Sequence, residues 1–139
     1  LHMAEPELFD RIYSQGVQLI DSFQMKDIFT NAVFGLHIVA AQGYLLHQEK
    51  EKALQALERY VNIVGGLKYP LKLKGNEYFT QVDEWLEENI PIGTNIPIDE
   101  MTVKTNLIRT IEDNPAFIPL REEEQYKKLV KKLKEKVMN

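Results

Sequence analysis

The stretch 27–66 constrains the fold of this chain more than any other, because its apolar side chains recur every three or four residues. That spacing places side chains on one face of a helix, so the stretch predicts two helices that pack on each other. Asp27 is expected to cap the first helix, and the polar run 48–52 marks the corner between the two. Gly65 and Gly66 are expected to end the second helix in a left-handed cap. The inward positions are Ile28, Phe29, Ala32, Val33, Leu36, Ala40 and Tyr44, followed by Ala53, Leu54, Leu57, Val61 and Val64.

This helix pair resembles a tetratricopeptide repeat, a two-helix unit in which small residues let the two helix axes approach closely. The matching positions are Ala41, Tyr44, Ala53 and Leu57. The chain departs from the repeat pattern at His37, Ala40 and Gly65, where the repeat prefers Trp, Leu and Pro. An ordinary antiparallel helix pair is the alternative interpretation.

Length and composition predict a single soluble domain. The chain has 139 residues, of which 44% are hydrophobic and 27% charged, as in ordinary globular proteins. Residues 1–3 look like a cloning remnant, so we assign the domain to 4–139. There is no cysteine and no apolar run of about 18–20 residues, so we expect a cytoplasmic protein without a membrane contact. The formal net charge of −4 argues against a nucleic-acid contact by this chain.

The remaining segments predict further helices around the pair. Pro6 suits the first turn of a helix that runs to about Ser22. Alternating apolar and polar residues over 67–73 predict an extended connector, and Pro70 excludes a central strand there. A helix is expected over 76–88 with Trp85 in the core, followed by an irregular linker over 89–98.

The C-terminal third predicts two helices joined by a short apolar clamp. Asp99 should cap a fifth helix, whose inward residues are Val103, Leu107, Ile108 and Ile111. Asn114 is expected to act as a cap at the start of the clamp, with Pro115 in the first turn, and the last helix is expected from about Glu122. Its acidic first turn and its lysine-rich end complement the helix dipole. Binding of phosphate or of an acidic partner is the alternative role of those lysines.

Three phrases resemble the C-terminal region of Xre-type helix-turn-helix regulators from low-GC Gram-positive bacteria. They are 26–32, the run 69–79 with 82–88, and Asn114-Pro115-Ala116-Phe117 with Tyr126-Lys127. The resemblance covers most of residues 25–133. It implies a tetratricopeptide-like all-α region that follows a DNA-binding domain and senses an effector or oligomerises. It implies no catalytic residue and no cofactor.

No motif in the sequence predicts an enzyme. His37 and His47 lie ten residues apart, and neither belongs to a His-x-x-x-His or Glu-x-x-His pair, so we expect no metal site. Ser14 and Ser22 lack the glycine pattern of a nucleophile elbow. Gly65-Gly66 is better explained as a helix end than as a phosphate-binding loop.

We therefore predict an all-α, tetratricopeptide-like array of five to six helices with a short extended connector. Its expected function is that of a regulatory or oligomerisation domain of a bacterial transcriptional regulator. A stand-alone adaptor for a peptide or protein is the alternative. Helical repeats bind partners along the first helix of each pair. The predicted strip that faces a peptide, a protein or a second copy is Asn31, Phe34, His37, Ile38 and Gln42, with a core role as the alternative for Phe34, His37 and Ile38.

Overall fold

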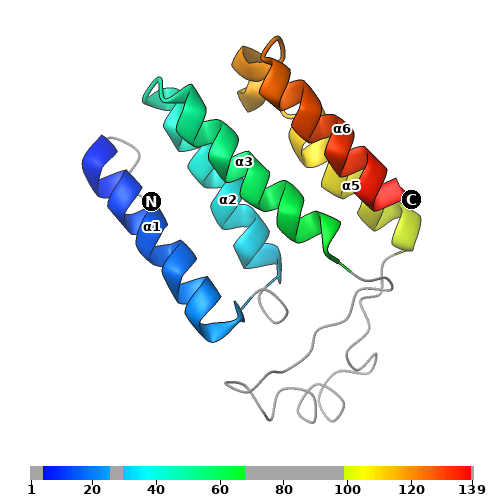
Figure 1. The fold of residues 1–139 in the computed structure, drawn as a ribbon, viewed down its shortest axis with the longest axis horizontal. Coiled ribbons are helices and arrows are strands. Elements are labelled where there is room, and N and C mark those ends of the chain that lie inside the picture. The colour runs from blue at the N-terminus through cyan, green and yellow to red at the C-terminus, as the bar shows by residue number, and fades with distance from the viewer. Residues whose placement is uncertain (1–4, 26–29, 68–98, 139) are drawn as a thin grey trace.

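A computed structural model describes residues 5–25, 30–67 and 99–138 (Figure 1). All regular structure in these ranges is helical, which confirms the predicted all-α class. The predicted cap at Asp27, the connector beyond Leu67, the helix at 76–88 and the linker at 89–98 lie outside the described residues. The described helices are α1 (Pro6–Phe23), α2 (Thr30–Leu46), α3 (Lys50–Gly65), α5 (Glu100–Glu112), the 3-10 helix η2 (Pro115–Leu120) and α6 (Glu124–Met138).

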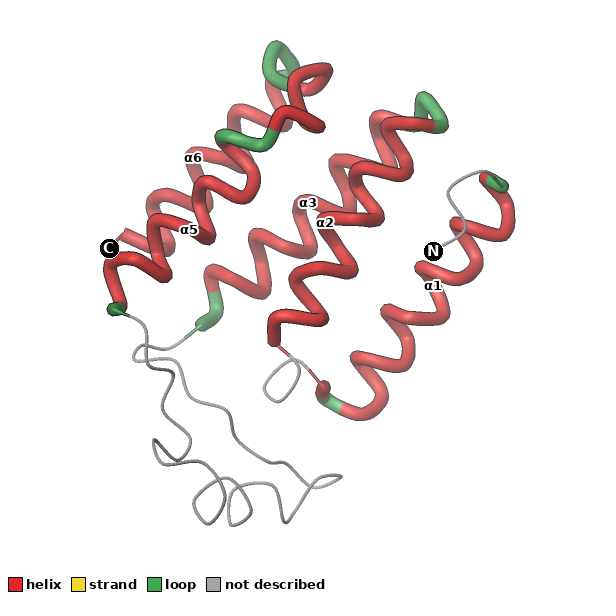
Figure 2. Tube along the Cα trace, turned by 180° about the vertical axis from the view of Figure 1, so that it is seen from behind, coloured by secondary structure: helices red, strands yellow, loops and turns green. Residues whose placement is uncertain are grey.

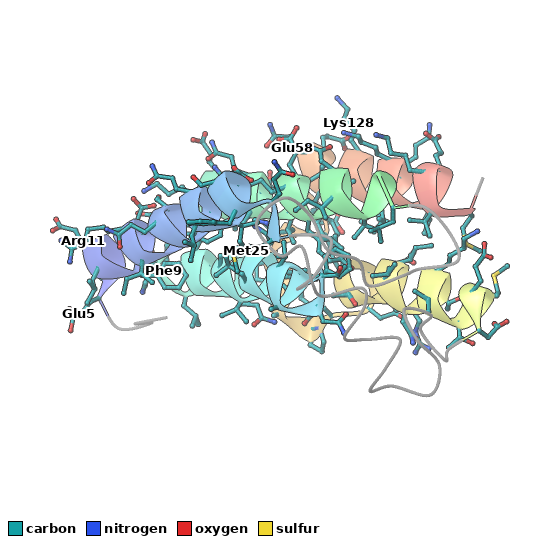
Figure 3. The ribbon with its side chains drawn as sticks, turned by 90° about the horizontal axis from the view of Figure 1, so that it is seen from below. Glu5, Phe9, Arg11, Met25, Glu58 and Lys128 are labelled. Atoms are coloured by element: carbon teal, nitrogen blue, oxygen red, sulfur yellow. The ribbon has the colours of Figure 1, made fainter. Side chains whose placement is uncertain are left out.

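The helices are arranged in two layers. Helices α1, α3 and α6 form one layer, while α2 and α5 lie in the other, as the view from below shows (Figure 3). Seen from behind, α2 lies between α1 and the α5–α6 pair (Figure 2). Helix α2 contacts both α1 and α3, and α3 contacts α6. Helix α2 is therefore covered on more than one side, as expected for a helix that is apolar over most of its girth.

Helices α2 and α3 form the predicted hairpin. The corner at 47–49 is tight: Gln48 adopts a left-handed conformation with φ of 60°, and the Glu49 N–H donates to the Tyr44 carbonyl at 2.8 Å. Tyr44, Ala53 and Leu57 are all buried in the same apolar cluster. Most of the described side chains that predicted this helix pair are buried in it, but the inward position predicted for Ala32 is wrong, because Ala32 is exposed. Ile28 and Phe29 lie outside the described residues.

Helix α3 ends where the sequence predicts, but the predicted left-handed cap is wrong. Gly66 has φ of −91° and ψ of −2°, a conformation that any residue adopts. Gly65 instead lies close to α6, where a Cβ atom would be 2.5 Å from Cδ of Lys136, so a larger residue would displace that lysine side chain. The glycine pair thus reflects how closely the end of α6 approaches α3.

The caps predicted in the C-terminal third are confirmed. The Asp99 carboxylate accepts from the Thr102 N–H at 3.0 Å, and the Asn114 side chain accepts from the Ala116 N–H at 3.0 Å. The predicted clamp is the 3-10 helix η2, which buries Phe117 and Leu120. The last helix begins at Glu124 rather than Glu122.

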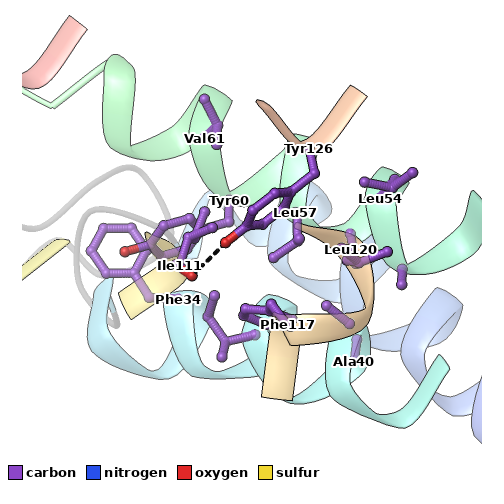
Figure 4. Packing of buried hydrophobic residues seen from close by; sticks show 14 of the residues in the cluster. Phe34, Ala40, Leu54, Leu57, Tyr60, Val61, Ile111, Phe117, Leu120 and Tyr126 are labelled. Atoms are coloured by element: carbon purple, nitrogen blue, oxygen red, sulfur yellow. Dashed lines mark hydrogen bonds between the residues drawn. The ribbon is translucent and has the colours of Figure 1, made fainter. Parts of the chain in front are cut away.

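The core lies where α2, α3, η2 and α6 meet (Figure 4). Tyr126 of α6 is buried there, and its hydroxyl donates to the Ile111 carbonyl at 2.8 Å. This bond satisfies a buried polar group and links α6 to the end of α5. The fully buried large side chains include Leu57, Tyr60, Phe117, Leu120 and Leu133.

Helix α1 packs on α2 mainly through its first half. Phe9 and Tyr13 are buried, whereas Leu19 and Phe23 are largely exposed. Phe9 meets the Tyr44 ring edge-to-face at a centroid distance of 5.0 Å. The apolar residues of α1 thus cover α2 along the first half of the helix, while its C-terminal part remains accessible to solvent.

Candidate functional site

Helix α2 carries an exposed face without a charged residue. No Asp, Glu, Lys or Arg occurs between Thr30 and Leu46, although several positions of this helix are exposed to solvent. The accessible positions recur every three or four residues and span roughly 100° of the helix circumference. We call this surface the α2 outer face; its residues are Asn31, Ala32, Gly35, Val39, Gln42 and Leu46.

The α2 outer face is apolar and open at its middle and at its C-terminal end. Leu46 is 71% exposed and Val39 is 37% exposed. Apart from its chain neighbours and the backbone of the helix itself, no described residue has an atom within 4 Å of the position that a Cβ atom would take at Gly35. A side chain from another molecule could therefore lie over Gly35 without displacing any described residue.

The structure divides the five predicted partner-facing residues between two sides of α2. Asn31 is exposed and Gln42 is half-buried, so both belong to the α2 outer face. Phe34, His37 and Ile38 are buried and face the core side, which is the alternative role weighed for them in the sequence. Phe34 packs edge-to-face on Tyr60 of α3 at a centroid distance of 5.5 Å. A partner therefore cannot contact these three side chains on the described surface.

His37 belongs to a buried polar contact between α1 and α2. Its Nδ1 atom lies 2.8 Å from the Tyr13 hydroxyl, and the two rings meet edge-to-face. Burial, together with the positive charge of Arg59, lowers the pKa of His37 to about 4, with Asp21 acting weakly in the opposite direction. The imidazole is thus neutral at pH 7 and can accept the hydroxyl hydrogen through Nδ1. The Arg59 guanidinium lies 5.3 Å from the centre of the Tyr13 ring, a cation–π contact.

A second polar contact joins α1 to the hairpin. The Tyr44 hydroxyl donates to Oδ1 of Asp10 at 2.6 Å, and Nζ of Lys52 lies 3.4 Å from the same oxygen. The bond from Tyr44 lowers the pKa of the Asp10 carboxyl and more than offsets the opposing effect of partial burial. Burial and the Asp10 carboxylate both raise the pKa of Tyr44. Neither tyrosine therefore supplies an easily lost proton, and both contacts are suited to fixing α1 in place.

The described residues were compared with the requirements of a metal cluster and of a membrane-spanning helix. Among residues 5–25, 30–67 and 99–138, no three histidine, aspartate or glutamate side chains are grouped so that they could hold a metal ion. Over the same ranges, no helix combines the length and apolar character needed to cross a bilayer.

A groove between α3 and α6 was not predicted from the sequence. It has a volume of about 330 Å³ and lies on the layer opposite to α2. Leu54 and Leu129 contribute apolar surface to it, while Glu51 and Glu58 come from α3 and Lys128 and Lys132 from α6. A single sequence holds no signal for this pairing, because the two helices are more than 50 residues apart. The outer face of α2 did have a signal, namely the run of 17 residues without a charge.

Comparison with protein-family models, with curated proteins and with solved structures found no match to this chain.

Proposed function

We propose that this chain is a non-catalytic interaction module of a bacterial helix-turn-helix regulator, and that its α2 outer face binds a peptide or protein partner. The observation that carries the proposal is the uncharged, exposed surface around Gly35 and Val39. Helix faces that remain in water usually carry charged residues. Moving apolar groups out of water lowers the free energy, so an exposed apolar face is stabilised when it is covered. An apolar face on a well-packed hairpin is therefore suited to being covered by another molecule.

Position within the hairpin supports the same surface. Helix α2 is the first helix of the pair, and tetratricopeptide-like repeats bind along first helices. The resemblance to Xre-type regulators suggests what binding would do. A bound peptide or protein would change the activity of a DNA-binding domain encoded outside this chain. The buried contact of Tyr13 with His37 and the partly buried contact of Tyr44 with Asp10 support α2 from the side of α1.

The size of the α2 outer face favours a peptide over a stable homodimer. Its 17 residues make a helix about 25 Å long, and the accessible arc is about 10 Å wide. A second copy seated on this face alone would bury roughly 500 Å² in total, well below the ~1,200 Å² of stable protein–protein interfaces. A short peptide needs no more than this area.

Selection of peptides from a displayed random library tests the binding face. We expect enriched peptides to bind wild type and to lose about tenfold or more in affinity with Gly35→Glu/Val39→Glu, because a partner would then cover two unpaired carboxylates. The matched control is Ser14→Glu/Gln18→Glu, which adds the same charge to exposed positions of α1. Equal loss in both variants, or no enriched peptide, would contradict the proposal, provided that circular dichroism shows all three proteins folded.

The coding sequence upstream of this region tests the regulator part of the proposal. We expect roughly 60–70 codons that encode a helix-turn-helix domain. A natural start codon near Met3 would contradict the regulator assignment and leave an adaptor that uses the same face.

A further inference from the structure

The groove between α3 and α6 differs from the α2 outer face because it carries opposite charges on its two sides. Glu51 and Glu58 line it from α3, and Lys128 and Lys132 line it from α6. In Figure 3, Glu58 and Lys128 both point outward from the layer that contains α1, α3 and α6. Leu54 and Leu129 lie between the two charged edges, and Leu54 is buried while Leu129 is half-buried.

An ion pair and a hydrogen bond between side chains connect α3 and α6. The Lys50 ammonium lies 3.4 Å from the Glu123 carboxylate at the start of both helices. Near their ends, Lys132 donates to the Asn62 side chain at 2.7 Å. Residues early in α3 thus pair with residues at the start of α6, and late residues with late ones, so the two helices run parallel. The groove between them is formed without a partner.

The charges that line the groove are not neutralised within the described part of the molecule. Glu51, Glu58 and Lys128 make no ion pair with any described residue, and Lys132 bonds to a neutral amide. Two parallel helices with an apolar seam and charged flanks resemble the surface that receives another helix in a coiled coil, where flanking charges select the partner. A partner helix would satisfy both edges only if its own edges carried opposite charges.

We propose that the α3–α6 groove binds an amphipathic helical segment of a partner protein, with apolar residues along its centre, Lys or Arg along one edge and Asp or Glu along the other. The basic edge lies against Glu51 and Glu58, and the acidic edge lies against Lys128 and Lys132. Because two edges of opposite sign must match, the direction of the bound helix is fixed. The groove is on the layer opposite to α2, so this inference holds whether or not the α2 outer face binds a ligand.

Three designed helical peptides test this inference. All have the same leucine seam; one has lysine on one edge and glutamate on the other, the second has lysine on both edges, and the third has glutamate on both. Fluorescence anisotropy with each labelled peptide at nanomolar concentration gives its affinity for wild type. We expect the mixed peptide to bind about tenfold more tightly than either same-sign peptide, because each same-sign peptide places like charges against one edge. The preference should shrink at high salt.

Charge reversal separates this site from non-specific adhesion. Glu51→Lys/Glu58→Lys makes both edges basic at exposed positions, and we expect the glutamate-edged peptide to become the tightest ligand. Gly35→Glu on the opposite layer should leave the wild-type order of affinities unchanged. The test of the α3–α6 groove therefore does not depend on whether the α2 outer face binds a partner. Equal affinity for the three peptides, no binding up to millimolar peptide, or an unchanged order after charge reversal would each overturn the inference.

Discussion

At the scale of single residues, α2 shows how one helix serves the core and the surface at once. Ala40, Ala41 and Tyr44 are buried against its neighbours, while Val39 and Leu46 reach solvent. Sequence reasoning identified α2 as the first helix of the pair, and three of its five candidate contact residues are buried, which is the core role that the sequence left open for them. Apolar residues occur on nearly all sides of α2, so their pattern does not show which side faces the core. Whether Phe34 or Val39 points inward depends on packing with α1 and α3.

Leu57 should be among the residues that contribute most to stability. Its side chain is fully buried in the hairpin core, so Leu57→Ala should lower the free energy of unfolding by about 2–5 kcal/mol. Val39→Ala, on the exposed face, should change it by no more than about 0.5 kcal/mol. Urea unfolding followed by circular dichroism measures both. Similar losses at the two positions would contradict the assigned core.

His37 should make stability depend on pH. Its pKa in the folded protein is about 4, below the ordinary value of 6.5, so between these values the unfolded chain binds more protons than the folded chain. Stability should therefore fall as the pH drops from 6.5 towards 4, with about 2 kcal/mol lost at pH 5 from this residue. Urea unfolding at pH 7.5 and pH 5 should show that His37→Gln loses less than wild type. An identical loss in both proteins would contradict a buried neutral imidazole.

At the scale of helices, the periodicity of apolar residues predicted each described α-helix, whereas the 3-10 helix η2 was expected only as an apolar clamp, and capping residues predicted two of the starts. Asp99 and Asn114 cap as expected because their function depends on local backbone geometry. The role of Gly65 could not be predicted in this way, since the approach of Lys136 involves a residue 71 positions along the chain. The α3–α6 groove was unpredictable for the same reason: its charges come from two helices whose pairing no local pattern encodes.

Two glycines inside helices should respond differently to substitution by alanine. Alanine favours a helix interior by about 0.5–1 kcal/mol over glycine. A Cβ atom at Gly35 would meet no other described side chain within 4 Å, so Gly35→Ala should stabilise the protein by about that amount. At Gly16 the new atom would lie 3.2 Å from Cδ2 of Leu36, so Gly16→Ala should gain less. Thermal midpoints measure the order of the two variants, and the reverse order would contradict the described packing of α1 on α2.

The C-terminal end of α1 should be less protected from amide hydrogen exchange than the C-terminal end of α3. Only Phe9 and Tyr13 of α1 are buried, and Phe23 is 42% exposed. The last turn of α3 instead contains buried Val64 and is covered by α6 at Gly65. We expect amide hydrogen exchange to be faster over 18–23 than over 60–65. Equal protection in the two segments would argue against the described exposure of α1.

At the scale of the whole molecule, two layers of helices produce two surfaces of different chemistry. The layer with α2 presents an uncharged face, and the layer with α3 and α6 presents a groove between acidic and basic edges. A scaffold of this kind fits a protein whose role is to bring other molecules together. We propose, rather than observe, that the helices form a tetratricopeptide-like unit and that this unit acts on a DNA-binding domain.

The most direct test of the proposed binding role is amide chemical-shift mapping with a peptide selected on the wild-type protein. With the protein labelled with ¹⁵N and titrated with that peptide, we predict the largest shift changes at Ala32, Gly35, Val39 and Leu46 on the α2 outer face. Shift changes confined to α1, α5 or the α3–α6 groove, with these four amides unmoved, would contradict the central claim that α2 presents the partner surface.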